Sequence, residues 1–348
     1  MNGLVQCPRL AFNLLANGNM TEALTDLMAN NDTGLGGQHR LDPLQISSIL
    51  CPLDFSEFSN RAFHYAISLS THFGCQLFIQ HIVERAQYVL LAGVGPGVVK
   101  LGPERPLRSS REEIRRMLIS SGVDTTKVTT LLNQGDVSAK ILETIAREPI
   151  DLVVMGTHGR KGFNRFFLGS VTEGIIHRAE CPVLAVSRPK NEAVFNGAET
   201  IRLKTILLAT DFSPHSDWAA AYAMKWACAW GARLILFHAV HETSSSMHSM
   251  VHLLPEYNPL FERQIAAARQ RIQQMKPGQG VPNCEMIFET RHGNPKEEIL
   301  RVADETGADL IVTGARGTSG SSVPWGSVSS AVVRDGGFPV LVVRERHP

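Results

Sequence analysis

The stretch Ile49-Leu50-Cys51-Pro52-Leu53-Asp54-Phe55-Ser56 is an apolar run that ends in an Asp-Phe-Ser triplet. The pattern returns later in the chain as Ile206-Leu207-Leu208-Ala209-Thr210-Asp211-Phe212-Ser213. The two triplets begin 211 − 54 = 157 residues apart. A strand-like segment that recurs in this way indicates a duplicated domain, so other landmarks should keep the same offset.

Glycine, histidine and proline landmarks keep that offset to within one residue. Pairs 157 residues apart are Gly74 and Gly231, His81 and His238, Gly169-Ser170 and Gly326-Ser327, and Pro182 and Pro339; pairs 158 apart are Gly135 and Gly293, and Gly156 and Gly314. The second copy therefore gains one residue before its third strand and loses one between Gly317 and Gly326. We predict an extension at 1–45, repeats at 46–188 and 203–345, and a polar linker at 189–202.

Each copy alternates apolar strand segments with amphipathic helical segments. In the first copy the expected strands are 46–53, 75–83, 127–133, 151–156 and 182–187. The last two are continuous apolar runs, which suit parallel strands covered on both faces. Helices between the strands imply right-handed crossovers and a doubly wound sheet. Asp136 is expected to cap a helix over 136–147, and Ser213-Pro214 to open the first helix of the second copy.

Composition excludes several classes of function. The chain has 348 residues, with 34 Lys plus Arg against 33 Asp plus Glu, a net charge of +1, so nothing favours nucleic acid or an anionic membrane as the main partner. No apolar run approaches the ~20 residues of a spanning helix, and no secretory signal pattern is visible, so we expect a cytoplasmic protein. The six cysteines have no zinc-ligand spacing, and we expect buried thiols.

Ligands of open α/β sheets bind beyond the carboxyl ends of the strands. Asp54 closes the first strand, where its carboxylate could accept hydrogen bonds from ribose hydroxyls or a base amine. Gly156-Thr157-His158-Gly159 closes the fourth strand, and its glycines let backbone amides approach phosphates. Gly169-Ser170-Val171 opens a helix, whose unpaired N–H groups favour an anion. Arg160, Lys161 and Arg165 add positive charge between these glycines.

Each of these features also has a simpler interpretation. The aspartates could only cap the following helices, the glycines could only make tight turns, and the three basic residues could form a solvated loop. The recurrence of the aspartate, the spaced glycines and the Gly-Ser pair in both copies favours the ligand site over these alternatives.

The pattern Gly156-x2-Gly159-x9-Gly169-Ser170, with Asp54 at the end of the first strand, resembles the ATP-binding signature of the universal stress protein family. The resemblance implies two tandem α/β domains, adenine nucleotide alpha-hydrolase-like five-stranded parallel-sheet sandwiches with strand order 3-2-1-4-5. The implied ligand is ATP, with or without Mg²⁺. The resemblance places adenine and ribose near Asp54, Ile82, Met155 and Gly156, and the phosphates near Gly159, Gly169, Ser170 and Val171. The positive charge of Arg160 makes it a further candidate contact for the nucleotide.

The second copy departs from the pattern. Asp211, Gly314, Gly317, Gly326 and Ser327 repeat the signature, but only eight residues separate the second glycine from the Gly-Ser pair. That loop holds no basic residue, although Arg316 lies just before it. Because Lys and Arg make charge-assisted bonds to phosphate, we expect the second copy to be weaker, altered in specificity or empty.

The resemblance implies a nucleotide-dependent stress-response or regulatory module with little or no turnover. No Gly-Lys-Ser/Thr P-loop, His-x-Gly-His or His-Glu-x-x-His motif is present. Two alternatives stay open: a slow ATPase using Asp54 and His158, and a nucleotide-free module that binds an unidentified protein partner. The family pairs domains through the last strand, here Val183–Val186 and Val340–Val343, so the chain could form an intrachain pseudo-dimer, with further homo-oligomers left open.

Two further segments could have a functional role. His238, His241, His248 and His252 include an i, i+4 pair suited to a metal on a helix, but they lie in a Ser- and Met-rich connection, where exposed loop histidines are the default. The apolar, glycine-rich stretch 88–99 could be a flap over the first site, a contact surface or a packed loop, and we favour packing.

Overall fold

The computed structural model describes residues 45–83, 87–90, 98–101, 107–159, 168–187, 195–196, 200–241, 258–275, 284–317 and 325–344. These residues form two compact units. The first unit holds Ile46–Arg202 together with Val333–Val342, and the second holds Leu203–Val332 together with Val343–Glu345. The predicted extension at 1–45 lies, except for Gln45, outside the described residues.

The first unit is built on five parallel strands in the spatial order 3-2-1-4-5, as predicted. In chain order they are β1 (Ser48–Leu53), β2 (Gln76–Val83), β5 (Val128–Gln134), β6 (Leu152–Gly156) and β7 (Val183–Val186). Every strand end lies within two residues of its expected position. The register of β1 against β2 pairs Leu53 with His81, so both strands end at one edge of the sheet.

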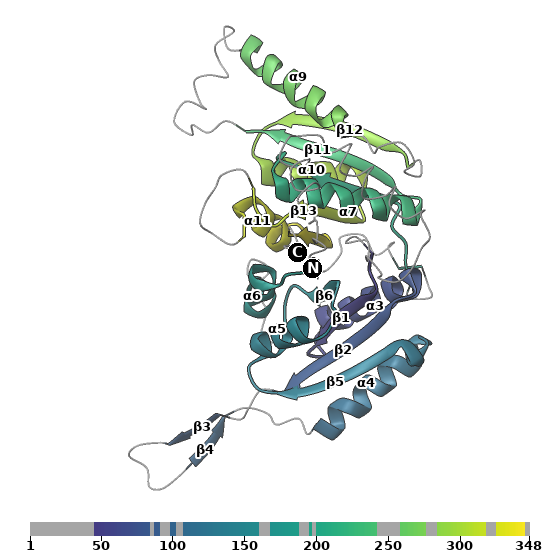
Figure 1. Ribbon diagram of the computed structural model, residues 1–348. Coiled ribbons are helices and arrows are strands. Elements are labelled where there is room, and N and C mark those ends of the chain that lie inside the picture. The colour runs from purple at the N-terminus through teal and green to yellow at the C-terminus, as the bar shows by residue number, and fades with distance from the viewer. Residues whose placement is uncertain are drawn as a thin grey trace, which may run out of the picture. The chain divides into compact units, whose positions relative to one another are not determined.

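Helices cover both faces of this sheet. They are α3 (Glu57–Phe73), α4 (Leu107–Ser121), α5 (Val137–Arg147) and α6 (Ser170–Arg178), with a 3-10 turn η1 (Thr125–Lys127). Figure 1 shows α3 and α4 on one face and α5 and α6 on the other, the arrangement that right-handed crossovers produce. Asp136 caps α5 as predicted, because its side chain accepts a hydrogen bond from the Ala139 amide (2.8 Å).

The second unit repeats the first four strands in the same order, 3-2-1-4. They are β10 (Thr205–Ala209), β11 (Arg233–Val240), β12 (Met286–His292) and β13 (Leu310–Gly314), with helices α7 (Pro214–Trp230), α9 (Asn258–Gln274), α10 (Pro295–Thr306) and α11 (Ser327–Asp335). Ser213 caps α7 and Pro214 occupies its first turn, as the sequence predicts.

The fifth strand of the second repeat, β14 (Val340–Val343), follows β13 in the sheet, so the strand order of this repeat is also 3-2-1-4-5, as predicted. Its residues Val340–Val342 are grouped with the first unit, where they pair antiparallel with β7. Leu341 lies opposite Leu184 in this register. The pairing is physically reasonable because an apolar strand edge with unpaired backbone groups favours a further strand.

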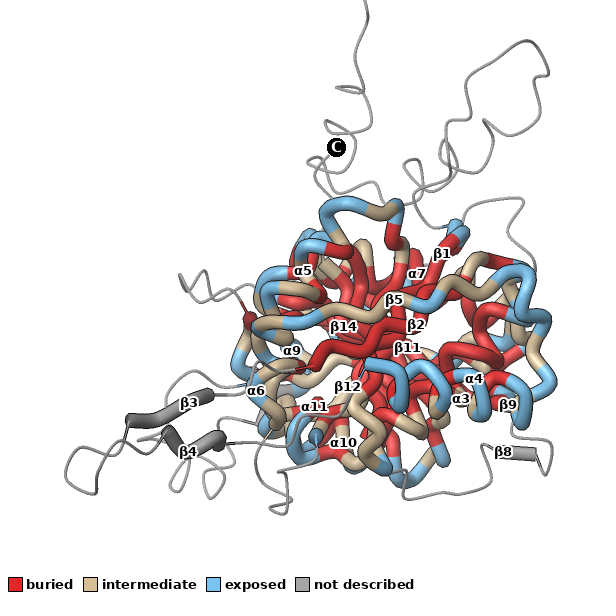
Figure 2. The backbone as a smooth tube through the Cα atoms, turned by 90° about the horizontal axis from the view of Figure 1, so that it is seen from below, coloured by how far each residue is buried: buried red, intermediate tan, exposed pale blue. Residues whose placement is uncertain are grey.

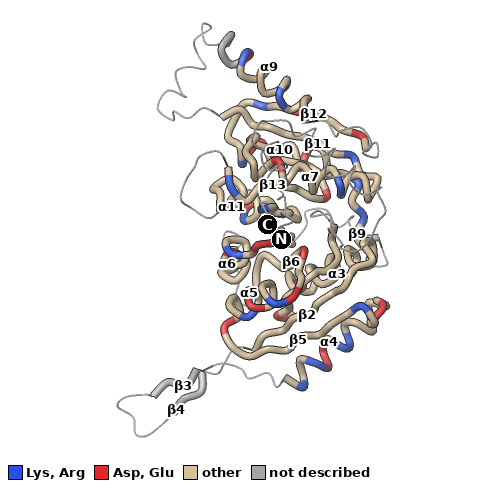
Figure 3. Tube along the Cα trace, in the orientation of Figure 1, with Lys and Arg blue, Asp and Glu red and all other residues tan. Residues whose placement is uncertain are grey.

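The core of each unit follows its inner strands, such as β2 and β11, which appear red in the burial view of Figure 2. Ile49, Leu50 and Cys51 of β1 are fully buried, as are Leu207 of β10 and Phe237 of β11. Burying one such aliphatic or aromatic side chain contributes about 1.5–3 kcal/mol. Lys, Arg, Asp and Glu are interspersed on outer helices such as α4 and α5 (Figure 3). Within the described ranges, no helix is both long and apolar enough to cross a membrane.

Two short hairpins complete the described structure. Strands β3 (Gln87–Leu90) and β4 (Val98–Leu101) pair antiparallel, so the ends of the stretch 88–99 form a hairpin, while 91–97 lie outside the described residues. Strands β8 (Phe195–Asn196) and β9 (Thr200–Ile201) lie in the predicted linker. The amide of Ile201 donates to Ser68 Oγ of α3 (3.0 Å), and the Ile201 side chain is buried. The end of the linker is therefore fixed to the first unit.

Candidate functional site

The first candidate site begins at the residue that follows β1. Asp54 Oδ1 accepts a hydrogen bond from the Ser56 amide (2.9 Å), across Phe55, which has a left-handed φ of 61°. The Ser56 side chain then caps α3 by accepting from the Ser59 amide (3.2 Å). Ser56, rather than Asp54, is thus the helix cap. A left-handed backbone at a bulky residue is uncommon, and such strain concentrates at functional sites.

The loop after β6 approaches this corner closely because it contains glycines. A Cβ placed on Gly159 would lie 2.9 Å from Asp54 Oδ2, and one on Gly156 would lie 2.7 Å from the backbone carbonyl carbon of Phe58. Distances under 3.0 Å are essentially absent for real Cβ atoms. Any larger residue would therefore push the loop away from Asp54 or from the start of α3.

The start of α6 closes the same corner from a third side. The Gly169 amide donates to the Thr157 carbonyl (2.8 Å), and Thr172 Oγ1 donates to the Gly156 carbonyl (2.7 Å). Gly169 is the N-cap residue of α6 and supplies no side-chain cap. The first amides of α6, at Ser170 and Val171, therefore begin a helix whose positive end can receive an anion.

Contacts thus join Asp54, Gly156, Gly159 and Gly169, and Ser170 and Val171 follow in the first turn of α6. The side chains of Ile82 and Met155 are almost fully buried, near the carboxyl ends of β2 and β6. Ile82 follows His81, whose ring lies 4.6 Å from that of Phe55. Arg160, Lys161 and Arg165 lie outside the described residues.

The second repeat builds the same corner from the matching residues. The Ser213 amide donates to Asp211 Oδ1 (3.1 Å), and Phe212 repeats the φ of 61°. A Cβ on Gly317 would lie 2.6 Å from Asp211 Oδ2, and one on Gly314 would lie 2.9 Å from the backbone of His215. The Gly326 amide donates to the Ala315 carbonyl (2.8 Å), and Ser327 begins α11.

An arginine that the sequence analysis did not identify distinguishes the second corner. The Arg271 guanidinium of α9 lies 4.4 Å above the Phe212 ring, and its Nη2 donates to the Phe212 carbonyl (3.3 Å). Buried residues Ile114 and Ile272 are 272 − 114 = 158 positions apart. The same offset aligns Arg271 with Glu113, so the charge at this position is reversed between the copies. In the sequence, this charge difference could have been found only by aligning the buried faces of α4 and α9.

Two ionisable groups near Arg271, Asp217 and His238, have shifted pKa values. The pKa of Asp217 is raised to about 6: burial raises it most, Arg271 lowers it, and the nearby Asp211 raises it by a smaller amount. Burial also lowers the pKa of His238, although its Nδ1 lies 2.7 Å from the Thr210 carbonyl oxygen, so the imidazole is neutral at pH 7. The first repeat has Asn60 where the second has Asp217 (217 − 60 = 157).

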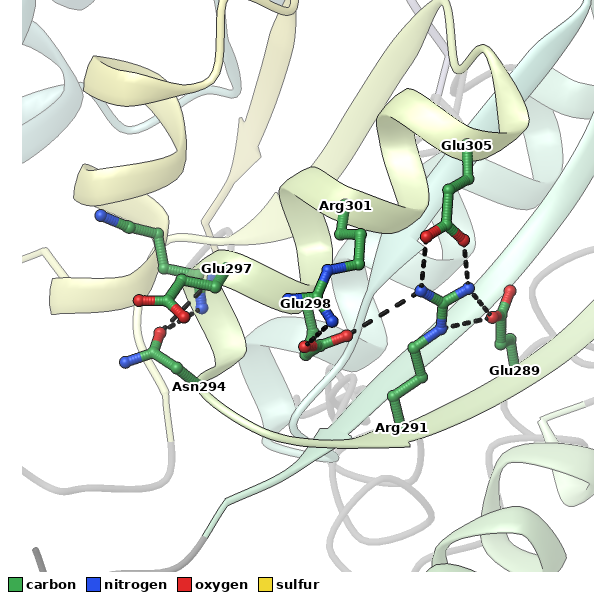
Figure 4. A network of polar contacts seen from close by, with 8 residues as sticks. Glu289, Arg291, Asn294, Glu297, Glu298, Arg301 and Glu305 are labelled. Atoms are coloured by element: carbon green, nitrogen blue, oxygen red, sulfur yellow. Dashed lines mark hydrogen bonds and ion pairs between the residues drawn. The ribbon is translucent and has the colours of Figure 1, made fainter.

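A separate charged cluster at the end of β12 is held together by its own ion pairs (Figure 4). Arg291 contacts Glu289 and Glu305, and Glu298 contacts both Arg291 and Arg301. The hydrogen bond to Glu305 is the main cause of the raised pKa of Arg291. These groups pair with one another and join β12 to α10, so the cluster is structural. Across the described ranges, no three His, Cys, Asp or Glu residues are grouped to hold a metal, and His248 and His252 lie outside those ranges.

A model of the universal stress protein family matches residues 46–187 and again 202–344. The chain belongs to the universal stress protein family. A universal stress protein of Mycolicibacterium smegmatis is 25% identical over 303 residues, which cover 86% of this chain and 97% of the relative. A second one, from Thermus aquaticus, is 37% identical over 148 residues, covering 40% of this chain and 98% of the relative. The crystal structure of a universal stress protein from Archaeoglobus fulgidus shares the fold, with 23% identity, a TM-score of 0.57, and coverage of 87% of this chain and 100% of that one.

Proposed function

We propose that the first repeat of this universal stress protein binds an adenine nucleotide, with ATP as the first candidate, and acts as a nucleotide-responsive module with little or no turnover. The observation that carries the proposal is the approach of Gly159 to Asp54 Oδ2, beside the N-terminus of α6. This corner combines a carboxylate, a glycine-lined backbone and a helix start, which together suit a ligand with hydroxyl groups at one end and phosphates at the other.

Each part of the corner has a role in this proposal. Asp54 accepts hydrogen bonds from ribose hydroxyls or the base amine. The amides of Gly159 and of the first turn of α6 donate to phosphate oxygens, and Arg160 adds a charge-assisted contact. A bound Mg²⁺ would neutralise part of the phosphate charge.

Little turnover is expected because the candidate acid–base groups are already engaged. His158 Nδ1 lies 3.0 Å from Thr157 Oγ1, and its ring lies 4.9 Å from that of Phe58. Asp54 Oδ1 is committed to the Ser56 amide. A base needs to reach a water or a hydroxyl of the substrate, and these contacts hold both groups in the framework of the corner.

The second repeat is proposed to bind more weakly or to prefer a different ligand. Its loop between Gly317 and Gly326 lacks the basic residues of the first repeat. Arg271 over Phe212, where the first repeat has Glu113 at the equivalent helix position, supports a difference in specificity as well as in affinity.

Matched substitutions in the two repeats test this proposal. Calorimetric titration with ATP and Mg²⁺ should detect binding to the wild-type chain. Asp54→Asn should weaken it about tenfold or more, because a hydrogen bond to a charged group contributes roughly 1.5–3 kcal/mol, whereas the matched Asp211→Asn should leave it unchanged. Gly169→Asp should also weaken binding, because it places a carboxylate beside the phosphates. The matched control Gly326→Asp should leave binding unchanged.

Other results select the alternatives. A wild-type chain that binds no nucleotide, and carries none through purification, would favour a protein-interaction module. Phosphate release that requires Mg²⁺ and is abolished by Asp54→Asn would favour a slow ATPase. Competition by ADP, AMP and a cyclic nucleotide would rank the ligands.

A further inference from the structure

Two cysteines of the second repeat differ from the other described cysteines. Cys51, Cys75 and Cys181 are buried, whereas Cys228 and Cys284 are both partly exposed, and neither forms a disulfide. The expectation of buried thiols is therefore wrong for this pair, and Cys7 lies outside the described residues. The thiols of Cys228 and Cys284 are in hydrogen-bonding contact, although 284 − 228 = 56 residues separate them.

The fold brings these cysteines together at one corner of the second unit. Cys228 lies in the last turn of α7, and its carbonyl accepts from the Gly231 amide (3.3 Å) where the helix ends. The chain then enters β11, where the Leu234 amide donates to the Glu285 carbonyl (2.8 Å). This bond places Cys284, the neighbour of Glu285, beside the turn that follows α7.

The first repeat closes the same corner with no cysteine at either of the two matching positions. Its α3 also ends at a left-handed glycine, and Lys127 Nζ donates to the carbonyl of that Gly74 (3.0 Å). The offsets of 157 and 158 align Cys228 with Thr71 and Cys284 with Thr126. Contact between the helix end and the start of the third strand is thus a property of the fold, and the second repeat fills it with two thiols.

We propose that Cys228 and Cys284 are a redox modification site that forms a reversible disulfide when a peroxide oxidises the protein. The two sulfurs are already in contact, and both residues are accessible to a small oxidant. A disulfide needs Cα atoms about 4.4–6.8 Å apart, a separation that suits side chains in contact across a helix end and a strand start.

The chemistry balances with a peroxide as the oxidant. The Cys284 thiolate attacks one oxygen of hydrogen peroxide, the O–O bond breaks, and a sulfenic acid and hydroxide form; the proton released by Cys284 converts the hydroxide to water. The Cys228 sulfur then attacks the Cys284 sulfur, the S–O bond breaks, and a second water leaves with the Cys228 proton. Two thiols lose two electrons in total, and a dithiol reductant reverses the reaction.

The environment of Cys228 shifts the pKa of its thiol. Burial, together with the neighbouring Cys284, raises the pKa of Cys228 to about 12, so Cys228 stays protonated at neutral pH.

Thiol counting on the full-length chain tests the proposal. Peroxide treatment, followed by alkylation in denaturant and intact-mass measurement, should reduce the six alkylatable thiols to four, with recovery of six after a dithiol reductant. Cys228→Ser and Cys284→Ser should each keep five thiols before and after peroxide. Tryptic digestion without reduction should link residues 226–233 to residues 272–291, a result that requires no variant. The oxidised protein should melt several degrees higher, because the bond closes a long loop.

Three outcomes would overturn the assignment. Six thiols could remain alkylatable at peroxide concentrations that oxidise free cysteine. Either serine variant could lose two thiols as the wild type does, which would show a different pair. The peroxide product could instead be a sulfinic acid on either residue with no linked peptide.

Discussion

Asp217 occupies the first turn of α7 between two charges of opposite sign, Asp211 and Arg271. Burial is the strongest influence on its carboxyl group and moves its pKa from the ordinary value near 4 to about 6. Because the folded state then holds this proton more tightly than the unfolded state, the free energy of unfolding falls as the pH rises from about 4 to about 6. Above about pH 6 this loss of unfolding free energy stays constant.

Asp217→Asn is expected to remove this pH dependence. The shift corresponds to about 3 kcal/mol at most, and solvent screening of a half-buried group reduces this to roughly 1–2 kcal/mol. The variant should therefore be more stable than the wild type by that amount at pH 7 and nearly equal to it at pH 4, by urea denaturation across this range. The reciprocal Asn60→Asp, where Asn60 Oδ1 is buried without a hydrogen-bond partner, should lose stability at pH 7. Parallel pH profiles for Asp217→Asn and the wild type would contradict the argument.

The sequence predicts most of the candidate corner but not its charges. Asp54, Gly156 and Gly159 are recognisable because a strand end and a tight turn need those residue types at fixed positions. The contact of Arg271 with Phe212 joins residues 271 − 212 = 59 positions apart, and that of Cys228 with Cys284 is similarly distant. No spacing motif encodes such contacts, since tertiary packing alone decides them.

At the scale of the element, two kinds of glycine hold the strands and helices in place. Gly156 ends β6 against the backbone of Phe58 in α3, where a Cβ has no room. Gly231 ends α7 with a φ of 59°, where a Cβ would have nothing within 4 Å. The first position is limited by space and the second only by backbone conformation.

Gly156→Ala should therefore cost more stability than Gly231→Ala. The first forces a contact of 2.7 Å on backbone atoms that cannot rotate away, and about 2–3 kcal/mol or more is expected. The second requires an alanine in the left-handed region and should cost about 1 kcal/mol. Denaturant midpoints of the two variants decide the matter, and Gly314→Ala should resemble Gly156→Ala. Equal losses at Gly156 and Gly231 would mean that the close approach is not what restricts Gly156.

Strand positions were predictable because continuous apolar runs mark buried parallel strands, and β1, β6 and β7 all read this way. The neighbours of β14 in the sheet were less predictable from its residues. Its four residues Val340–Val343 are as apolar as those of β7, and such a run specifies a strand without specifying its neighbour. The antiparallel register with β7 is therefore information that only the structure supplies.

At the scale of the whole molecule, the duplication raises the question of whether one chain satisfies its own strand pairing. Residues Val342 and Val183 lie opposite each other in the β14–β7 register. Both strands are apolar and fully buried. An intrachain pseudo-dimer makes this pairing a unimolecular event, whereas two separate chains would need to associate.

Paired cysteines at this register distinguish the two cases. In a chain that also carries Cys228→Ser and Cys284→Ser, we expect Val183→Cys with Val342→Cys to form an intrachain disulfide under mild oxidation. Directly opposed residues bring Cβ atoms about 4.5–5.5 Å apart, and Leu184→Cys with Leu341→Cys samples the other hydrogen-bonding phase of the ladder. Non-reducing electrophoresis should show a compact monomer, while the off-register pair Val183→Cys with Val340→Cys should link far less. Covalent dimers that grow with protein concentration would instead place β7 of one chain against β14 of another, and the intrachain pseudo-dimer would be wrong.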